Sequence, residues 1–187
     1  MNQNLHVIID HNLDTKNNIQ KIYIHPYFQS IKEQSTILNY HWDDYDKLKK
    51  DYNYLNELQL KLIDKIGEFL NIFHKTSHSN KYWEILIGDW IYTYCVIIFD
   101  RWEMTTSLQN LNKNITIELK NYFEKDMLAQ SVDELNNLLY LNDYNSYLFS
   151  KILNHRFLEN KNFSIILKDI EPKEFFLNKL KFRQKPS

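Results

Sequence analysis

Hydrophobic positions in the first forty residues come in short runs that are separated by turn-forming residues. Three of these runs cover residues 5–9, 21–24 and 36–40. Runs of four or five residues that are rich in β-branched and aromatic side chains are typical of strands. The stretches between them are long enough for crossover connections, so we expect a small sheet whose strands run mostly parallel.

A helical spacing follows this strand-rich part. Apolar residues then recur at every third or fourth position: Leu48, Tyr52, Leu55, Leu58, Leu62, Ile66, Phe69 and Phe73. This spacing draws one apolar stripe along a helix. Asp43 or Asp44 can cap the start of this helix, because a carboxylate there accepts hydrogen bonds from free backbone N–H groups.

A second helix is expected over residues 81–108, and its composition differs from that of the first. From Ile85 to Phe99 the residues are apolar on every side of the helix, apart from Asp89. This run is too short and too polar for a membrane span. We therefore expect a buried helix and no transmembrane segment. A lone carboxylate in such a run needs a charged partner from another element, or a wet site.

After residue 110 the pattern weakens. It predicts a strand at 114–119, helices at 132–141 and 144–153, a strand at 163–167 and a short helix from Pro172. The fold class that we expect is α/β, with a small, mostly parallel N-terminal sheet and a predominantly helical remainder. Residues 1–187 would form a single domain. Its parts would be strand-rich (1–42), two long helices of which the second is buried (43–110), and mixed but mostly helical (111–187).

Composition limits the classes of function. The chain has 23 Lys and Arg against 24 Asp and Glu, a formal net charge of -1. This balance argues against nucleic-acid binding by bulk electrostatics and against a polybasic membrane anchor. One cysteine excludes an internal disulfide, and a reducing cytoplasm is the natural compartment,.

Glycine is the most informative residue type. Only Gly67 and Gly88 are present, and both lie in helix-like stretches. Loops that cradle phosphates need glycine for close backbone approach and positive φ. We therefore expect no nucleotide-phosphate loop and no cofactor in this chain. A diphosphate ligand would have to be held by another polypeptide segment.

The block from Tyr40 to Asp44 is the first candidate for chemistry, because it follows an expected strand and precedes a helix. Ligands of α/β sheets bind at the carboxyl ends of strands. His41 beside Asp43 and Asp44 could act as a general base or bind sugar hydroxyls. In the alternative interpretation, Asp43 only caps the helix and Trp42 only packs.

Aromatic residues of the second helix form another candidate. Tyr82, Trp83 and Trp90 could stack on the apolar side of a sugar ring, with the indole N–H as a polar group. Core packing is the alternative for all three. His74 and His78 are four residues apart, but no third ligand is evident nearby, so we expect no metal site,.

Charged residues near the end of the apolar run complete the candidate site. Arg101 could hold a carboxylate or phosphate with two hydrogen bonds, or simply form an ion pair at the helix end. Asp89 and Asp100 share a helix face, but about 16 Å separates them, so they cannot share one proton. We expect His41, Asp43, Asp44, Asp89 and Arg101 to line a shared cleft.

Taken in order, these residues resemble the N-terminal half of a transferase family found in bacterial surface-carbohydrate (O-antigen-type) gene loci. The resemblance covers roughly residues 36–155. It rests on residues 40–44, Lys47-Leu48, Asp51-Tyr52, Tyr54-Leu55, Leu70-Asn71, His74, Ser79, Tyr82-Trp83, residues 85–88, Trp90, residues 99–102 and residues 143–153. The chain departs from the family at Asp89, where a proline is usual, and at Glu84, where a basic residue is usual.

The resemblance implies a partner as well as a function. Members are about three times longer, and their C-terminal part looks like a two-domain glycosyltransferase. The region present here would be the acceptor-side or organising part, inactive without a C-terminal glycosyltransferase-like domain or chain, and it would bind a carbohydrate acceptor. The alternative is a non-catalytic protein-interaction module or the remnant of a split gene.

Overall fold

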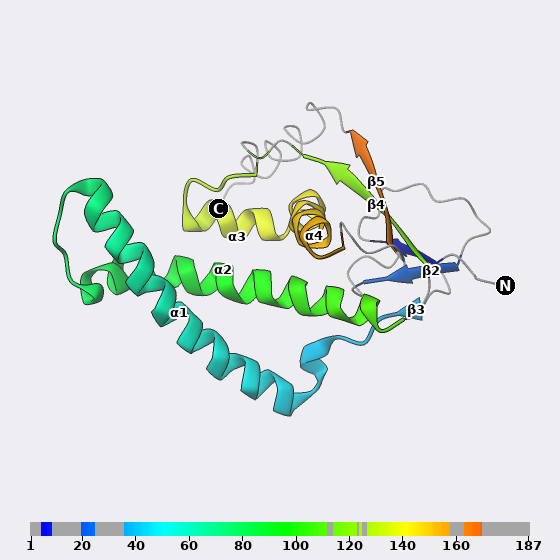
Figure 1. Ribbon diagram of the computed structural model, residues 1–187, viewed down its shortest axis with the longest axis horizontal. Coiled ribbons are helices and arrows are strands. Elements are labelled where there is room, and N and C mark those ends of the chain that lie inside the picture. Colours follow the sequence, from blue (N-terminus) through cyan, green and yellow to red (C-terminus); the bar gives the residue numbers. More distant parts are fainter. Residues whose placement is uncertain are drawn as a thin grey trace, which may run out of the picture. The chain divides into compact units, whose positions relative to one another are not determined.

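The computed structural model describes residues 5–8, 20–24, 36–111, 114–122, 124, 127–157 and 163–169 of the chain. Contacts divide the chain into two compact units, whose elements are drawn in Figure 1. The hairpin unit consists of residues 40–103, and the sheet unit consists of residues 1–39 and 104–187. That the whole chain forms a single domain stays a prediction.

The sheet unit contains a five-stranded parallel sheet. The strands are β1 (Leu5–Ile8), β2 (Gln20–Tyr23), β3 (Thr36–Ile37), β4 (Ile115–Asn121) and β5 (Phe163–Asp169). Their order across the sheet is β3-β2-β1-β4-β5, and Val7 of β1 lies opposite Ile22 of β2 and Ile117 of β4. The mixed α/β class, with parallel strands and a mostly helical remainder, is confirmed. The sheet is larger than expected, because two later strands join the three of the first forty residues.

Alternation along β4 shows which face of this strand is covered. Ile115, Ile117 and Leu119 are buried, while the residues between them are partly exposed. Helix α4 (Asn142–Phe157) packs against β4, and the ring of Phe157 stacks on Phe163 with 4.0 Å between centroids. Helix α3 (Val132–Leu139) precedes α4. The short helix expected from Pro172 lies outside the described residues.

Two long helices make up most of the hairpin unit. Helix α1 spans Tyr45–His74, and helix α2 spans Asn80–Gln109, of which residues 80–103 belong to this unit. Asp44 caps α1 by accepting hydrogen bonds from the backbone N–H groups of Asp46 and Lys47, as the sequence predicts. Lys75 ends α1 in a left-handed conformation, with φ of 56°.

The two helices pack closely together at a glycine of α1. A Cβ atom on Gly67 would lie 2.7 Å from Cδ1 of Trp83, too close for any larger residue without a shift. Trp83 is buried there with Ile63 and Ile91, and its indole N–H donates to the side-chain oxygen of Asn71. Gly67 therefore sets the distance between α1 and α2.

The expectation that α2 is buried on every side is wrong for its N-terminal half. Ile85 is 77% exposed and Leu86 57% exposed, and Asp89 is exposed as well. Within the hairpin unit α1 covers one side of α2, so residues on the opposite side reach solvent. The carboxylate of Asp89 is thus solvated and needs no buried partner.

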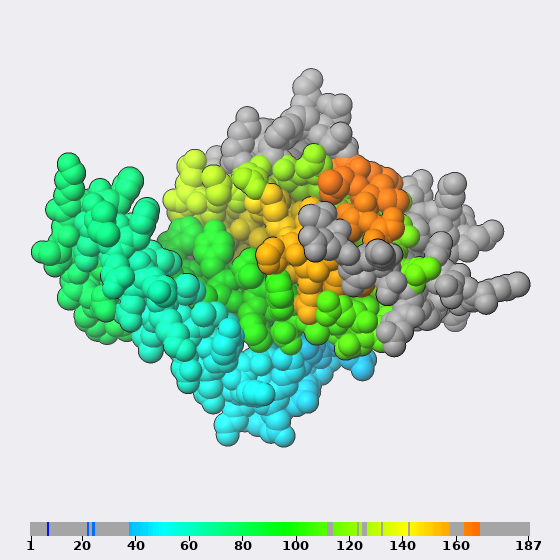
Figure 2. Space-filling view, viewed as in Figure 1, coloured from blue at the N-terminus to red at the C-terminus, as the bar shows by residue number. Residues whose placement is uncertain are grey.

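By length and composition, α2 is apolar enough to cross a membrane. This is weak evidence, because the core helix of a soluble protein passes the same test. Large apolar residues of α1 are exposed near the end of the hairpin, which is coloured teal in Figure 2. They are Phe69, Ile72 and Phe73.

Candidate functional site

A short turn places His41 against α2. The 3-10 turn η2 (His41–Asp43) lies directly before the cap of α1. From this turn, Nε2 of His41 lies 2.9 Å from Oδ1 of Asp100, and the two side chains are only 6% and 5% exposed. Nδ1 of the same ring is buried and has no hydrogen-bond partner within the described part of the chain. A buried polar atom without a hydrogen bond costs free energy, so the environment of Nδ1 needs an explanation.

Asp100 is the centre of this polar cluster. Burial by itself would raise the pKa of Asp100, but the hydrogen bond from His41, the charge of Arg101 and hydrogen bonds from Tyr40 and Arg101 outweigh it. The pKa of this carboxyl is therefore lowered, and Asp100 is ionised at neutral pH. Burial, with the charge of Asp100 next in size, raises the pKa of Tyr40, so its hydroxyl stays neutral and donates to Asp100.

The ionised carboxylate determines the state of the imidazole. An anionic Asp100 can only accept a hydrogen bond, so Nε2 of His41 carries the proton in this pair. In the neutral ring the lone pair then lies on Nδ1. A carboxylate likewise fixes the tautomer of the histidine in a catalytic triad.

A second set of polar contacts adjoins the first. The indole N–H of Trp42 donates to Oδ2 of Asp51 at 3.1 Å. Nζ of Lys47 lies 2.6 Å from the same oxygen and 2.9 Å from Oε2 of Glu103. Burial opposes the charge of Lys47, but hydrogen bonds to these two carboxylates raise its pKa overall. The ammonium group therefore stays charged.

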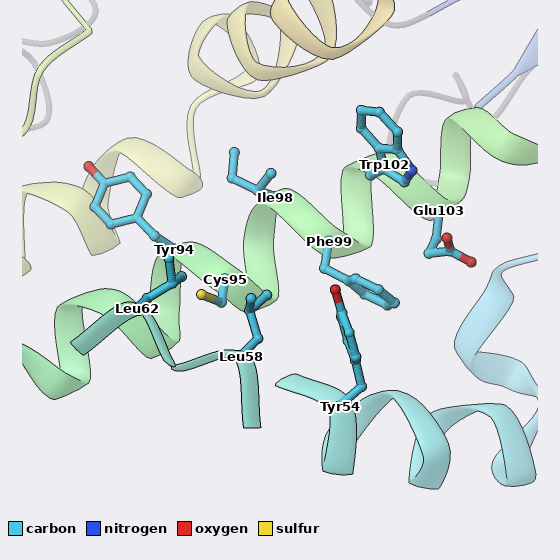
Figure 3. A pocket seen from close by; sticks show the side chains of 9 residues that line it. All are labelled: Tyr54, Leu58, Leu62, Tyr94, Cys95, Ile98, Phe99, Trp102 and Glu103. Carbon is cyan, nitrogen blue, oxygen red and sulfur yellow. The ribbon is translucent and has the colours of Figure 1, made fainter. Parts of the chain in front are cut away.

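A groove lies between α1 and α2 and has a volume of about 480 Å³. Figure 3 shows Tyr54 and Phe99 pointing toward one another, near Glu103. Phe99 also stacks on Trp42, with 6.4 Å between ring centroids and 19° between planes. One end of the groove is thus continuous with the polar contacts of Trp42 and Lys47. The lining residues are Tyr54, Leu58, Leu62, Tyr94, Cys95, Ile98, Phe99, Trp102 and Glu103.

The structure brings together only part of the expected site. His41, Asp100 and Arg101 form one cluster, with Trp42 beside it. Asp43 and Asp44 are exposed. Asp44 acts as the helix cap, so the capping interpretation applies to it rather than to Asp43.

The residues of the first half of α2 lie away from this cluster. Asp89 is eleven residues before Asp100, a separation of about 16 Å along the helix. Trp83 packs in the core beside Gly67. Tyr82 stacks on His78 near the start of α2, and Trp90 stacks on Tyr94 of the same helix.

Several residues of the site were not expected from the sequence. Lys47 and Asp51 are among them. The signal for Asp51 was present, because this carboxylate interrupts the apolar stripe of α1 one turn before Leu55, and it is only 7% exposed. Lys47 precedes it by one turn and supplies the matching charge. No feature of the sequence predicted the groove, because the residues that line it have the spacing of an ordinary helix core.

A separate polar cluster lies in the sheet unit, at the carboxyl end of β4. The hydroxyl of Tyr122 donates to Oδ1 of Asp143 at 3.1 Å, and Nζ of Lys120 lies 3.4 Å from the same oxygen. These groups join the end of β4 to the start of α4. Among the described residues, no group of three or more His, Cys, Asp or Glu side chains could hold a metal ion.

Comparison with known proteins assigns the chain to a family. A family model described as LIC12162 family transferase matches residues 17–185. The chain belongs to the LIC12162 transferase family. No curated protein and no solved structure matches it. The expectation of a transferase family is confirmed. A transferase moves a group from a donor to an acceptor, so this is the class of reaction that the name of the LIC12162 family indicates.

Proposed function

We propose that this chain is the acceptor-side part of a glycosyltransferase-like enzyme of surface-polysaccharide synthesis, in which His41 takes the proton of the acceptor hydroxyl. The observation that carries the proposal is the buried pair of His41 and Asp100, with Nδ1 of His41 left without a partner among the described residues. Membership of a transferase family supports the class of reaction. The resemblance to transferases of surface-carbohydrate gene loci is the reason for proposing surface-polysaccharide synthesis.

A general base fits this reaction because a hydroxyl group must lose its proton when it attacks the donor carbon. The new bond forms between the acceptor oxygen and that carbon, the bond from the carbon to the leaving group breaks, and Nδ1 accepts the proton. A well-placed base accelerates such a step by about 10²–10⁴-fold. Asp100 would stabilise the imidazolium that results, as the carboxylate of a catalytic triad does.

The donor side is proposed to lie in another polypeptide segment. The chain has only two glycines. Neither of them is in a loop: Gly67 lies in α1 and Gly88 in α2. A diphosphate needs backbone N–H groups that can approach it closely. We therefore expect the isolated 187-residue chain to show no saturable binding of sugar nucleotides in a thermal-shift screen, because only ligand binding to the native state would raise its stability.

The test of this function is a substitution in the chromosomal gene of the source organism. His41→Gln keeps a group that can donate to Asp100 but removes the base, so we expect the surface polymer to be lost while the protein remains folded and present. His74→Gln is the matched control, because His74 is exposed at the end of α1. Normal amounts of polymer in the His41→Gln strain would refute the proposed role of His41.

A second candidate function is a non-catalytic interaction module, favoured by the exposed apolar residues at the hairpin end. Ile72 is 78% exposed and Ile85 77% exposed. Large exposed apolar patches mark sites of association. The same strains separate the two functions: an interaction module would tolerate His41→Gln and fail with Ile85→Glu, whereas the proposed enzyme would fail with His41→Gln.

A further inference from the structure

The groove of the hairpin unit differs in character along its length. At one end, Leu62 and Tyr94 form apolar and aromatic walls. At the other end, Glu103 pairs with Lys47, and Phe99 stacks on Trp42 beside His41. Of the nine lining residues only Glu103 is charged. An apolar channel with a few polar groups at one end is a typical binding site for a molecule with an apolar body and a polar head.

The dimensions of the groove define the apolar body. On α1 the lining runs from Tyr54 to Leu62, a length of roughly 12 Å. An extended chain advances about 1.2 Å per bond, so roughly ten carbons would fit along the groove. The volume of about 480 Å³ lies within the range of sites for small molecules,.

The polar end defines the head group. Lys47 carries a positive charge that its two carboxylate partners hold in place. The indole of Trp42 lies beside the imidazole of His41, with 4.6 Å between ring centroids. Aromatic rings stack on the apolar face of a sugar, and carboxylates accept hydrogen bonds from its hydroxyls. A sugar head at this end would lie beside Trp42, whose ring contacts both Phe99 of the groove and His41.

We propose that the groove between α1 and α2 binds the linear hydrocarbon chain of an amphiphilic acceptor, whose sugar head lies at the end formed by Trp42, Lys47 and Glu103. This inference rests on the proposed function for the role of the sugar hydroxyl, and it adds the class of molecule that carries this hydroxyl. The apolar chain supplies affinity, and the polar end sets the position of the head. No covalent step involves the groove itself.

Alkyl β-glucosides of increasing chain length test this inference with the full 187-residue chain. Binding is measured by isothermal titration calorimetry below the micelle concentration of each compound. Burial of each further methylene should tighten binding about threefold to fourfold until the groove is filled at roughly ten carbons, after which affinity should level off. Methyl β-glucoside, which has the same head, should bind far more weakly.

Cys95 reports where the alkyl chain lies. It is the only cysteine of the protein and lines the groove, and burial raises its pKa, so it reacts slowly,. Decyl β-glucoside should protect Cys95 from N-ethylmaleimide in proportion to its occupancy in the titration. Methyl β-glucoside at the same concentration should not.

Two tryptophan substitutions form a matched pair. Ile98→Trp adds bulk inside the groove, at a residue that is 39% exposed and can therefore accept a larger side chain. It should weaken binding of decyl β-glucoside at least tenfold. Leu86→Trp adds similar bulk to the same helix outside the groove, at a residue that is 57% exposed, and should leave binding unchanged. Circular dichroism should show that both variants fold.

Several outcomes would overturn the inference. They are affinity that does not depend on chain length, equal weakening by both tryptophan variants, and no protection of Cys95. A concentration-dependent dimer that protects Cys95 without any glucoside would assign the groove to a second copy of the chain, and would overturn it too.

The same experiments distinguish a failure of the proposed function from a failure of this inference. His41→Gln should leave glucoside binding intact while it abolishes the surface polymer. Loss of the polymer without chain-length-dependent binding would refute the groove alone. Binding in the groove together with normal polymer from His41→Gln would refute the base alone.

Discussion

Among single residues, Asp100 does most to organise the candidate site. It accepts a hydrogen bond from His41 and from Tyr40 and lies next to the charge of Arg101. Burial alone would favour its neutral acid, and these partners together reverse that preference. The ionised carboxylate then fixes which nitrogen of His41 carries the proton, which is why we assign the lone pair to Nδ1.

The lowered pKa of Asp100 predicts how stability depends on pH. A carboxyl whose pKa is lower in the folded than in the unfolded chain stabilises the native state above its ordinary pKa of 3.8. That contribution is lost as the pH falls through the folded-state value. We therefore expect the free energy of unfolding of the wild type, relative to Asp100→Asn, to be largest near neutral pH and to shrink below pH 3.8.

Urea denaturation of both chains, at about pH 7 and about pH 3, measures this difference. Glu57→Gln is the control, because Glu57 is an exposed carboxylate of α1. A difference between wild type and Asp100→Asn that does not change with pH would contradict the assigned charge of Asp100.

At the scale of secondary-structure elements, the packing of α1 on α2 depends on one small residue. Gly67 lies against Trp83, where a Cβ would come within 2.7 Å of the indole. At Gly88 a Cβ would lie 3.5 Å from its nearest neighbour, Nε2 of Gln59, an ordinary contact distance. Both glycines are inside helices, so each substitution by alanine gains the same conformational term.

Gly67→Ala and Gly88→Ala should therefore change stability in opposite directions. Overpacking against a buried indole should destabilise the Gly67→Ala chain by about 1–3 kcal/mol. Gly88→Ala should stabilise the chain by about 0.5–1 kcal/mol, because alanine is the better helix residue. Chemical denaturation gives both values, and equal effects of the two substitutions would contradict the packing of α1 on α2.

Most elements could be predicted from the sequence because their signals are local. The stripe from Leu48 to Phe73 and the cap at Asp44 depend on residues within one helix and the turn before it. The strand at 115–121 could be predicted in the same way, but not its place beside β1. Strand order depends on pairings between segments more than a hundred residues apart, and a local pattern carries no information about such pairings.

The site was predicted only in part for the same reason. His41, Asp100 and Arg101 all stood out in the sequence, but nothing in it linked His41 to Asp100. The contact of His41 with Asp100 joins residues that are 59 positions apart. The groove lies between residues 54–62 of α1 and residues 94–103 of α2, away from the contact at Gly67. Helical periodicity carries no information about the space between two helices.

At the scale of the whole molecule, the two faces of α2 differ in role. Residues on the covered face stabilise the fold, whereas residues on the exposed face are available for association. Ile85 is 77% exposed, whereas Ile91, on the same helix, is 9% exposed and packs with Ile63 and Trp83. Both residues lie in the same apolar run, so burial was predicted for both. Only the position of α1 distinguishes them.

Glutamate substitutions at these two residues test the distinction. Ile85→Glu should change the free energy of unfolding by no more than about 0.5 kcal/mol, as surface substitutions usually do. Ile91→Glu should destabilise the chain by more than about 3 kcal/mol, because it buries an unpaired charge. Thermal and urea denaturation measure both variants. A large loss of stability in Ile85→Glu would show that this face of α2 is covered.

The protonation state of the His41 ring shows whether Asp100 leaves the lone pair on Nδ1, as a general base at this position requires. A long-range ¹H–¹⁵N correlation spectrum of the imidazoles distinguishes the two neutral tautomers. We expect the proton of neutral His41 on Nε2 and the lone pair on Nδ1 in the wild type, and a loss of this preference in Asp100→Asn. A proton on Nδ1 in the wild type, or a tautomer unaffected by Asp100→Asn, would contradict the account.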